Sequence, residues 1–135
     1  MRLTPILFVF SLLCLNVVAQ DLNIESVSKA FIKNNGQIVD QNGKVNESVK
    51  YLYPSRNGMN IQLKEQGLSY DTYKRLNSTE SFVSHRLDIE FLNSSKEILM
   101  YELEPQDYKL RYVTSKQVIE TSAFKKIIYE NLYPN

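Results

Sequence analysis

His85 is the only histidine in the sequence, and its side chain is the natural candidate for a general base near neutral pH. A Ser-His-Asp arrangement would combine it with Asp88 or Asp71, but no Gly-x-Ser-x-Gly elbow is present to supply the serine. His85 also opens an alternating segment in which Leu87 marks the inward side. The pattern therefore favours a partly buried sheet histidine over a catalytic one.

Two pairs of carboxylates have a spacing that acid–base chemistry could use. Asp88 and Glu90 share one side of a predicted strand, and Glu102 and Glu104 repeat the spacing. Catalytic pairs in glycosidases lie across a cleft, in environments that separate their pKa values. Arg86 shares the side of Asp88, and the alternation marks that side as solvated. We therefore interpret both pairs as charged, wet surface and predict no catalytic residues.

Residues that bind metals are sparse. A single histidine rules out a two-histidine site, and Cys14 is the only cysteine. Residues 40–43, Asp-Gln-Asn-Gly, offer oxygen ligands for calcium but lack the run of carboxylates and the closing glutamate of a defined loop. A hairpin turn is the favoured interpretation, and the sequence predicts neither a metal site nor a cofactor.

Tyrosine is over-used, with nine copies in 135 residues. Tyr51 and Tyr53 share one side of a predicted strand, and Tyr70 and Tyr73 follow nearby. These four residues are a candidate binding surface for proteins or glycans. Ordinary packing within a sheet is the alternative for each of them. The absence of tryptophan weakens the glycan interpretation, because indole is the larger stacking surface.

β-Strands must position these side chains, because alternation dominates residues 20–135. In residues 86–91 apolar and charged residues alternate without a break, and the Asn-Gly pairs at 42–43 and 57–58 are typical of hairpins. The pattern predicts a single all-β domain with an antiparallel, β-sandwich-like fold. The expected strands lie near 30–34, 48–53, 59–64, 68–74, 83–92, 97–103, 107–113 and 125–130.

Residues 1–19 have the three parts of a secretory signal peptide. A positive start, an apolar core over 5–15 and compact residues at 17–19 predict cleavage before Gln20. The apolar core is shorter than the roughly 20 residues that a membrane-spanning helix needs. A lipoprotein signal built on Cys14 is the alternative, but the leucine before this cysteine fits that signal poorly.

Cleavage would change the composition of the exported chain. It removes the only cysteine, and it takes Arg2 from the 16 basic residues, which leaves 15 against 15 acidic ones. A neutral balance gives no electrostatic footprint for nucleic acid or an anionic membrane. No later apolar run reaches membrane-spanning length. We expect a secreted or cell-surface domain that does not span the membrane once processed.

Three ordered stretches of the sequence resemble a known family. They are Phe31 to Gln37 followed by Val49 to Leu52, Gly58 to Ile61 running into Gly67 to Asp71, and Phe124 to Tyr129 leading to Asn131 to Asn135. The series resembles the N-terminal domain of large exported proteins of Bacteroidota that carry SBBP β-propeller-type repeats or gliding-motility-associated C-terminal domains. Lys33 departs from the family, in which an acidic residue is usual, and this leaves the role of that position open.

The resemblance implies a β-rich surface or secreted domain without a defined activity, exported by type IX secretion. Relatives continue beyond the segment that ends here at Asn135, so a fragment or a truncated product is expected, with a final strand missing and a sheet edge exposed. We expect a role in adhesion or assembly through contacts with other domains, surface proteins or glycans. The alternative is a carbohydrate-binding or accessory module of a secreted hydrolase.

Overall fold

The computed structural model describes residues 29–55, 58–76, 82–115 and 117–134, and the expected signal peptide lies outside them. The described residues form seven strands and no helix. The strands are β1 (Phe31–Lys33), β2 (Tyr51–Ser55), β3 (Met59–Lys64), β4 (Gly67–Arg75), β5 (Phe82–Glu90), β6 (Leu99–Val113) and β7 (Val118–Glu130). They pair antiparallel throughout, in one open sheet with the order β5-β4-β3-β2-β1-β7-β6. The predicted all-β antiparallel fold is confirmed.

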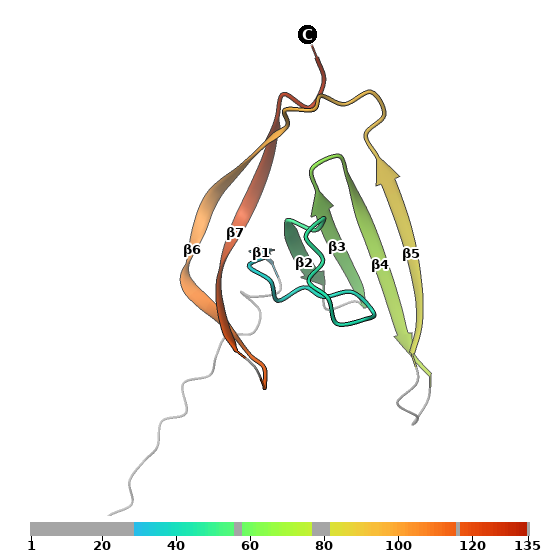
Figure 1. Ribbon diagram of the computed structural model, residues 1–135, viewed down its shortest axis with the longest axis vertical. Helices are drawn as coiled ribbons and strands as arrows, with labels where there is room; N and C mark the ends of the chain where they lie inside the picture. Colours follow the sequence, from blue (N-terminus) through green and yellow to red (C-terminus); the bar gives the residue numbers. More distant parts are fainter. Residues whose placement is uncertain (1–28, 56–57, 77–81, 116, 135) are drawn as a thin grey trace, which may run out of the picture.

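The sheet bends strongly between its two halves (Figure 1). β6 and β7 lie on one side, β4 and β5 on the other, and the chain between β5 and β6 joins them at the top. The Tyr51 hydroxyl donates to Glu102 Oε1 at 2.7 Å, and the Tyr129 hydroxyl donates to the carbonyl of Lys64 at 2.7 Å. The rings of Phe91 and Tyr129 meet edge to face with their centroids 5.6 Å apart. These contacts give the single sheet its sandwich-like form.

A bulge in β6 contributes to the bend. Pro105 pairs with Phe124 and Lys109 with Ser122, so four steps along β6 match two along β7. Glu104, beside the bulge, has a φ of 54°. Bulges bend a strand and increase its twist. The sequence predicts two separate strands here, and the structure shows one long strand with this irregularity in it.

The core consists of two clusters. The smaller joins Ala30, Ile32 and Ala123, with Tyr108 and Leu110 packed against them. The larger is formed by Tyr51, Leu63 and Phe124, with Phe31, Ile61, Leu68, Met100, Ile127 and Tyr129 packed around them. The larger cluster therefore takes side chains from both sides of the bend, and the β6–β7 hairpin covers the apolar face of β2, β3 and β4.

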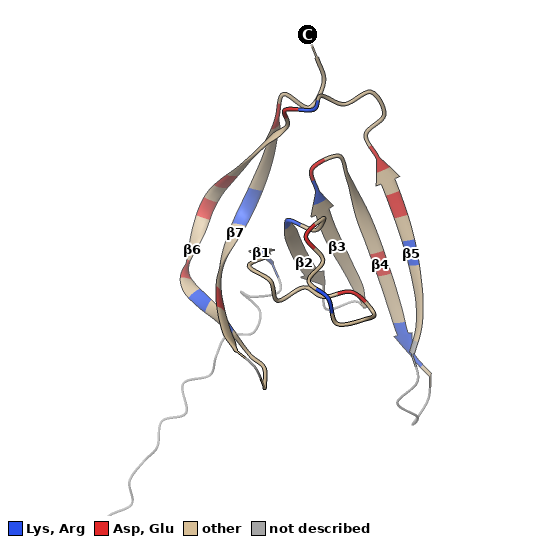
Figure 2. Ribbon diagram, in the orientation of Figure 1, with Lys and Arg blue, Asp and Glu red and all other residues tan. Residues whose placement is uncertain are grey.

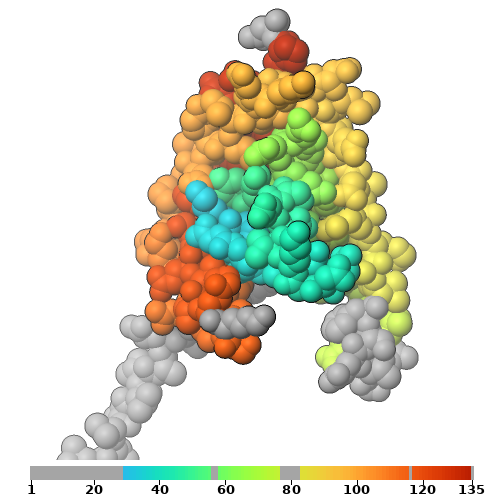
Figure 3. Space-filling model, viewed as in Figure 1, coloured from blue at the N-terminus to red at the C-terminus, as the bar shows by residue number. Residues whose placement is uncertain are grey.

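The burial of the β5 side chains differs from the prediction. The alternation of 86–91 predicts that Leu87 and Ile89 are buried, but they are 60% and 40% exposed. The reason is that β5 lies at the end of the sheet, with β4 as its only neighbour among the described strands, and that neither core cluster includes a residue of β5. Figure 2 shows basic and acidic positions mixed on strands at both ends of the sheet, and Figure 3 shows β5 along the margin of the molecule.

Candidate interaction site

His85 and its two candidate acids lie on opposite faces of the sheet. Arg86 pairs with Asp71, and His85 is one step away along β5, so it projects from the face of Leu87. Asp71 and Asp88 project from the other face. His85 is exposed rather than partly buried, since β5 ends the sheet and contributes no residue to either core cluster of the described chain. The structure does not bring these residues together as a triad.

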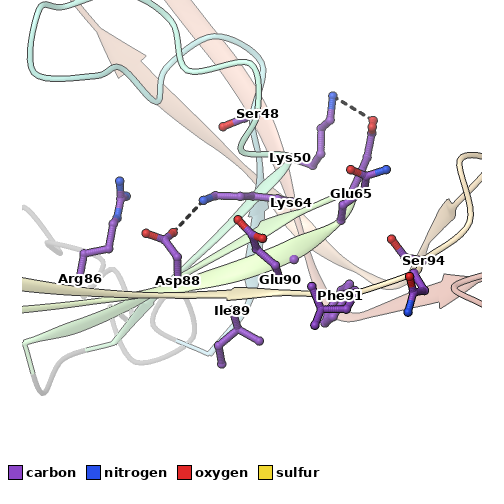
Figure 4. A pocket seen from close by; sticks show the side chains of 14 residues that line it. Ser48, Lys50, Lys64, Glu65, Arg86, Asp88, Ile89, Glu90, Phe91 and Ser94 are labelled. Carbon is purple, nitrogen blue, oxygen red and sulfur yellow. Dashed lines mark hydrogen bonds and ion pairs between the residues drawn. The ribbon is translucent and has the colours of Figure 1, made fainter.

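The charged face of β3, β4 and β5 lines an open groove of about 850 Å³ (Figure 4). Arg86, Asp88 and Glu90 point into it from β5, Lys64 reaches in from β3, and Ser48 lies across from them. The three residues of β5 are exposed, which confirms the prediction of a solvated charged face for Asp88 and Glu90.

Asp88 is held by two donors from the neighbouring strands. Its Oδ1 atom accepts a bond from the hydroxyl of Ser69 and another, at 2.9 Å, from Lys64 Nζ. Both bonds favour the charged carboxylate, so they lower the pKa of Asp88. They use only Oδ1, which leaves Oδ2 for a further donor.

Arg86 forms the second fixed point of the groove. Its Nε and Nη2 atoms donate to the Asp71 carboxylate at 2.7 and 3.0 Å, and Nη2 also donates to Gln62 Oε1 at 2.7 Å. The bond to Asp71 outweighs burial and raises the pKa of Arg86, so the side chain stays charged. These bonds leave Nη1 for a further acceptor.

The prediction that Glu102 lies on a wet charged face is wrong. It is half-buried and accepts bonds from the Tyr51 hydroxyl and from Lys33 Nζ, each at 2.7 Å. Burial acts to raise the pKa of Glu102, but the bonds from Lys33 and Tyr51 outweigh it and lower the pKa. Burial and the bond to Glu102 raise the pKa of Tyr51 well above its usual range. The ion pair with Glu102 also gives Lys33 a role, whereas Glu104 is exposed as predicted.

The four candidate tyrosines do not form one exposed surface. Tyr51 is 5% exposed, and Tyr53 and Tyr70 are half-buried on the same face of the sheet. Tyr73 is 44% exposed and projects from the opposite face, the face of Asp71. Only Tyr73 therefore offers an exposed ring, and it lies on the side of the charged groove.

Residues 40–43, which offer oxygen ligands for calcium in the sequence, form a tight hairpin turn. Val39 and Val45 form an isolated antiparallel bridge around it. The Asp40 carboxylate accepts the backbone N–H groups of Asn42 and Lys44 at 2.8 and 2.9 Å, as in turns that an aspartate side chain stabilises. The hairpin interpretation is confirmed. Within the described ranges no group of three or more His, Cys, Asp or Glu side chains could hold a metal ion.

The surface that the sequence does not reveal is the β5 edge, by which we mean residues 83–90. All eight of these residues are exposed. Val83, Leu87 and Ile89 are 39%, 60% and 40% exposed and share one face. The alternation of the sequence shows which side chains share a face, but it does not show that the strand lies at the end of the sheet.

The backbone of the β5 edge is also available. The N–H of Phe91 donates to the carbonyl of Gln66 at 3.0 Å, so the odd-numbered residues of β5 direct their backbone groups to β4. The even-numbered residues direct theirs away from the sheet. They have no backbone partner among the residues that the structure describes, and such a row of N–H and C=O groups is a template for another strand.

These features define an all-β domain with an open sheet edge beside a charged groove. Residues 31–135 match the family described as a domain of unknown function, DUF7948, and the chain belongs to that family. No curated protein and no solved structure matches the chain. In the part of the chain that the structure describes, no helix is long and apolar enough to cross a membrane.

Proposed function

We propose that the domain is a non-catalytic part of a secreted or cell-surface protein and serves adhesion or assembly through protein contacts. The observation that carries this proposal is the β5 edge, in which Leu87 is 60% exposed and the even-numbered residues direct their backbone groups away from the sheet. Partners add a strand to such an edge through main-chain hydrogen bonds, and side chains on alternate positions give specificity. The separation of His85 from Asp71 and Asp88 also supports binding rather than catalysis.

Cross-linking in the producing cell tests this role. A photoreactive amino acid at position 87 is expected to give a discrete adduct, because this position lies at the centre of the edge. The matched control is position 113 on β6, where Val113 is 73% exposed. Equal labelling at the two positions, or none at position 87, would reject the β5 edge as the contact surface.

Export is the second part of the proposal. It is supported by the signal peptide expected in residues 1–19 and by the resemblance to N-terminal domains of exported Bacteroidota proteins with SBBP repeats or gliding-motility-associated domains, for which type IX secretion is the route. N-terminal sequencing of the chain from the medium or the cell surface should find Gln20 first. A chain that retains residues 1–19, or that is lipidated at Cys14, would contradict simple cleavage.

A carbohydrate-binding or accessory module of a secreted hydrolase is the second candidate, and Tyr73 favours it. Its exposed ring lies on the side of the groove, two residues from Asp71, so a sugar could stack on the ring and reach polar atoms. Saturable binding to a polysaccharide panel should be lost in Tyr73→Ala and kept in Tyr133→Ala, the control at a tyrosine that is 54% exposed. If both variants bind as wild type does, this candidate should be dropped.

A further inference from the structure

The β5 edge is complementary to itself, and we infer that its partner is a second copy of this chain, paired antiparallel through β5. The inference rests on the proposed function, which assigns protein contacts to the same edge. Two copies related by a two-fold axis present the same surface to each other, as in most closed homodimers. An antiparallel pair of β5 strands would extend the sheet across that axis.

The backbone limits how two β5 strands can pair. Only the even-numbered residues direct their N–H and C=O groups outward, so even-numbered residues must face each other. Of the three such registers centred on the middle of the strand, one sets Arg86 opposite Arg86 and another sets Asp88 opposite Asp88. Both place like charges face to face, which is destabilising. The third register, centred on Leu87, sets Arg86 opposite Asp88 on both sides of the axis.

Within the described parts of the chain, no hydrogen bond or ion pair uses the atoms needed for these two ion pairs. Within the chain, Arg86 uses Nε and Nη2, and Asp88 uses Oδ1. Nη1 of one copy can therefore donate to Oδ2 of the other without loss of the bonds that each copy already makes. Ser84 then lies opposite Glu90, so no like charges meet within residues 84–90.

The same register covers the exposed apolar side chains. Leu87 faces Leu87 in a pair without hydrogen bonds between the two residues, the type in which the side chains approach most closely. Ile89 faces His85 on each side. The apolar face that β5 leaves open in one copy would thus continue into the apolar face of the other, and burial of apolar surface favours association.

Disulfide trapping tests the register directly. In a Cys14→Ser background the chain has no cysteine, and Leu87→Cys should form a disulfide-linked dimer under mild oxidation. Val113→Cys, at a residue that is 73% exposed on β6, should stay monomeric. Dimer formation by Leu87→Cys no faster than by Val113→Cys would overturn the register.

Sedimentation equilibrium tests the association itself. Wild type should show twice the mass of one chain, and Leu87→Lys should raise the dissociation constant at least about tenfold, because two lysines would meet on the axis. Leu87 is 60% exposed, so this variant should fold, which circular dichroism verifies. A wild-type chain that stays monomeric at every concentration overturns the second-copy inference. A photoadduct from position 87 to a different protein would then still support the proposed function. If neither an adduct nor a dimer forms, the proposed function and the second-copy inference are both rejected.

Discussion

The two edge strands of the sheet, β5 and β6, differ in how far they are protected. β6 has one covered face, with Leu110 packed on the smaller core cluster, and it is interrupted by Pro105 and a bulge. β5 pairs with β4 in a continuous register from Phe82 to Glu90 and is exposed on both faces. Bulges, prolines and covering segments keep further strands from adding to an edge. One end of the sheet is therefore interrupted and covered on one face, and the other is continuous and exposed on both faces.

A matched pair of leucines gives the largest expected difference between the two edges. Leu110→Ala removes a side chain that packs on Ala30, Ile32 and Ala123, and it should lower the free energy of unfolding by about 2–3 kcal/mol. Leu87→Ala removes a side chain that is 60% exposed and should change it by less than about 0.5 kcal/mol in the single chain. Urea denaturation at low protein concentration measures both. Equal losses would show that β5 is covered after all.

Prolines at adjacent positions sharpen the assignment of the open side of β5. His85 directs its N–H to β4, so His85→Pro would leave a carbonyl of β4 unpaired and should cost about 1–3 kcal/mol. Ser84 directs its N–H outward, and proline is tolerated where the N–H faces solvent. Ser84→Pro should therefore fold with nearly wild-type stability but fail to dimerise. Thermal unfolding measures the loss of stability, and sedimentation measures the loss of dimer. If Ser84→Pro were less stable than His85→Pro, the assignment of odd-numbered N–H groups to β4 and even-numbered ones to the open side would be wrong.

The fold is predictable from the sequence where one strand face is buried and the other is wet. In β3, Leu63 is buried and Ile61 packs beside it, as the alternation of residues 59–63 indicates. In β5 the same kind of pattern gives the right faces but the wrong burial. Alternation is a property of one strand, whereas burial depends on what covers the strand, and here that is decided by a bend between distant segments.

The candidate site shows the same limit. The sequence predicts a surface carboxylate at Glu102, because Glu102 and Glu104 repeat the spacing of Asp88 and Glu90. Its bonds to Lys33 and Tyr51 join β6 to β1 and β2. Lys33 lies 69 residues before Glu102 in the chain, and Tyr51 lies 51 residues before it. A contact of that separation has no local signal in a single sequence. The separation of Tyr73 from Tyr70, in contrast, has a local signal, because residues three apart on a strand project from opposite faces.

The carboxylates Glu102 on β6 and Asp88 on β5 give the smallest of these contrasts. Both have a lowered pKa in the folded chain, because Lys33 and Tyr51 bond to Glu102, and Ser69 and Lys64 bond to Asp88. A group with a lowered pKa stabilises the fold above its unfolded pKa, and this stabilisation is lost as the pH falls through the folded pKa. The loss should begin near the ordinary values of 4.5 for Glu102 and 3.8 for Asp88.

Neutral variants separate the two contributions. Glu102→Gln should cost about 1 kcal/mol at pH 7, since it removes a charge-assisted bond to Lys33 at a half-buried site, and it should flatten the fall in stability below pH 4.5. Asp88→Asn should cost less, because the Asp88 side chain is 49% exposed and water screens its bond to Lys64. Urea unfolding at pH 7 and at pH 3 measures both. If Asp88→Asn costs as much as Glu102→Gln, the charged face of β5 is shielded from solvent as the site of Glu102 is, and the contrast between the two edge strands fails.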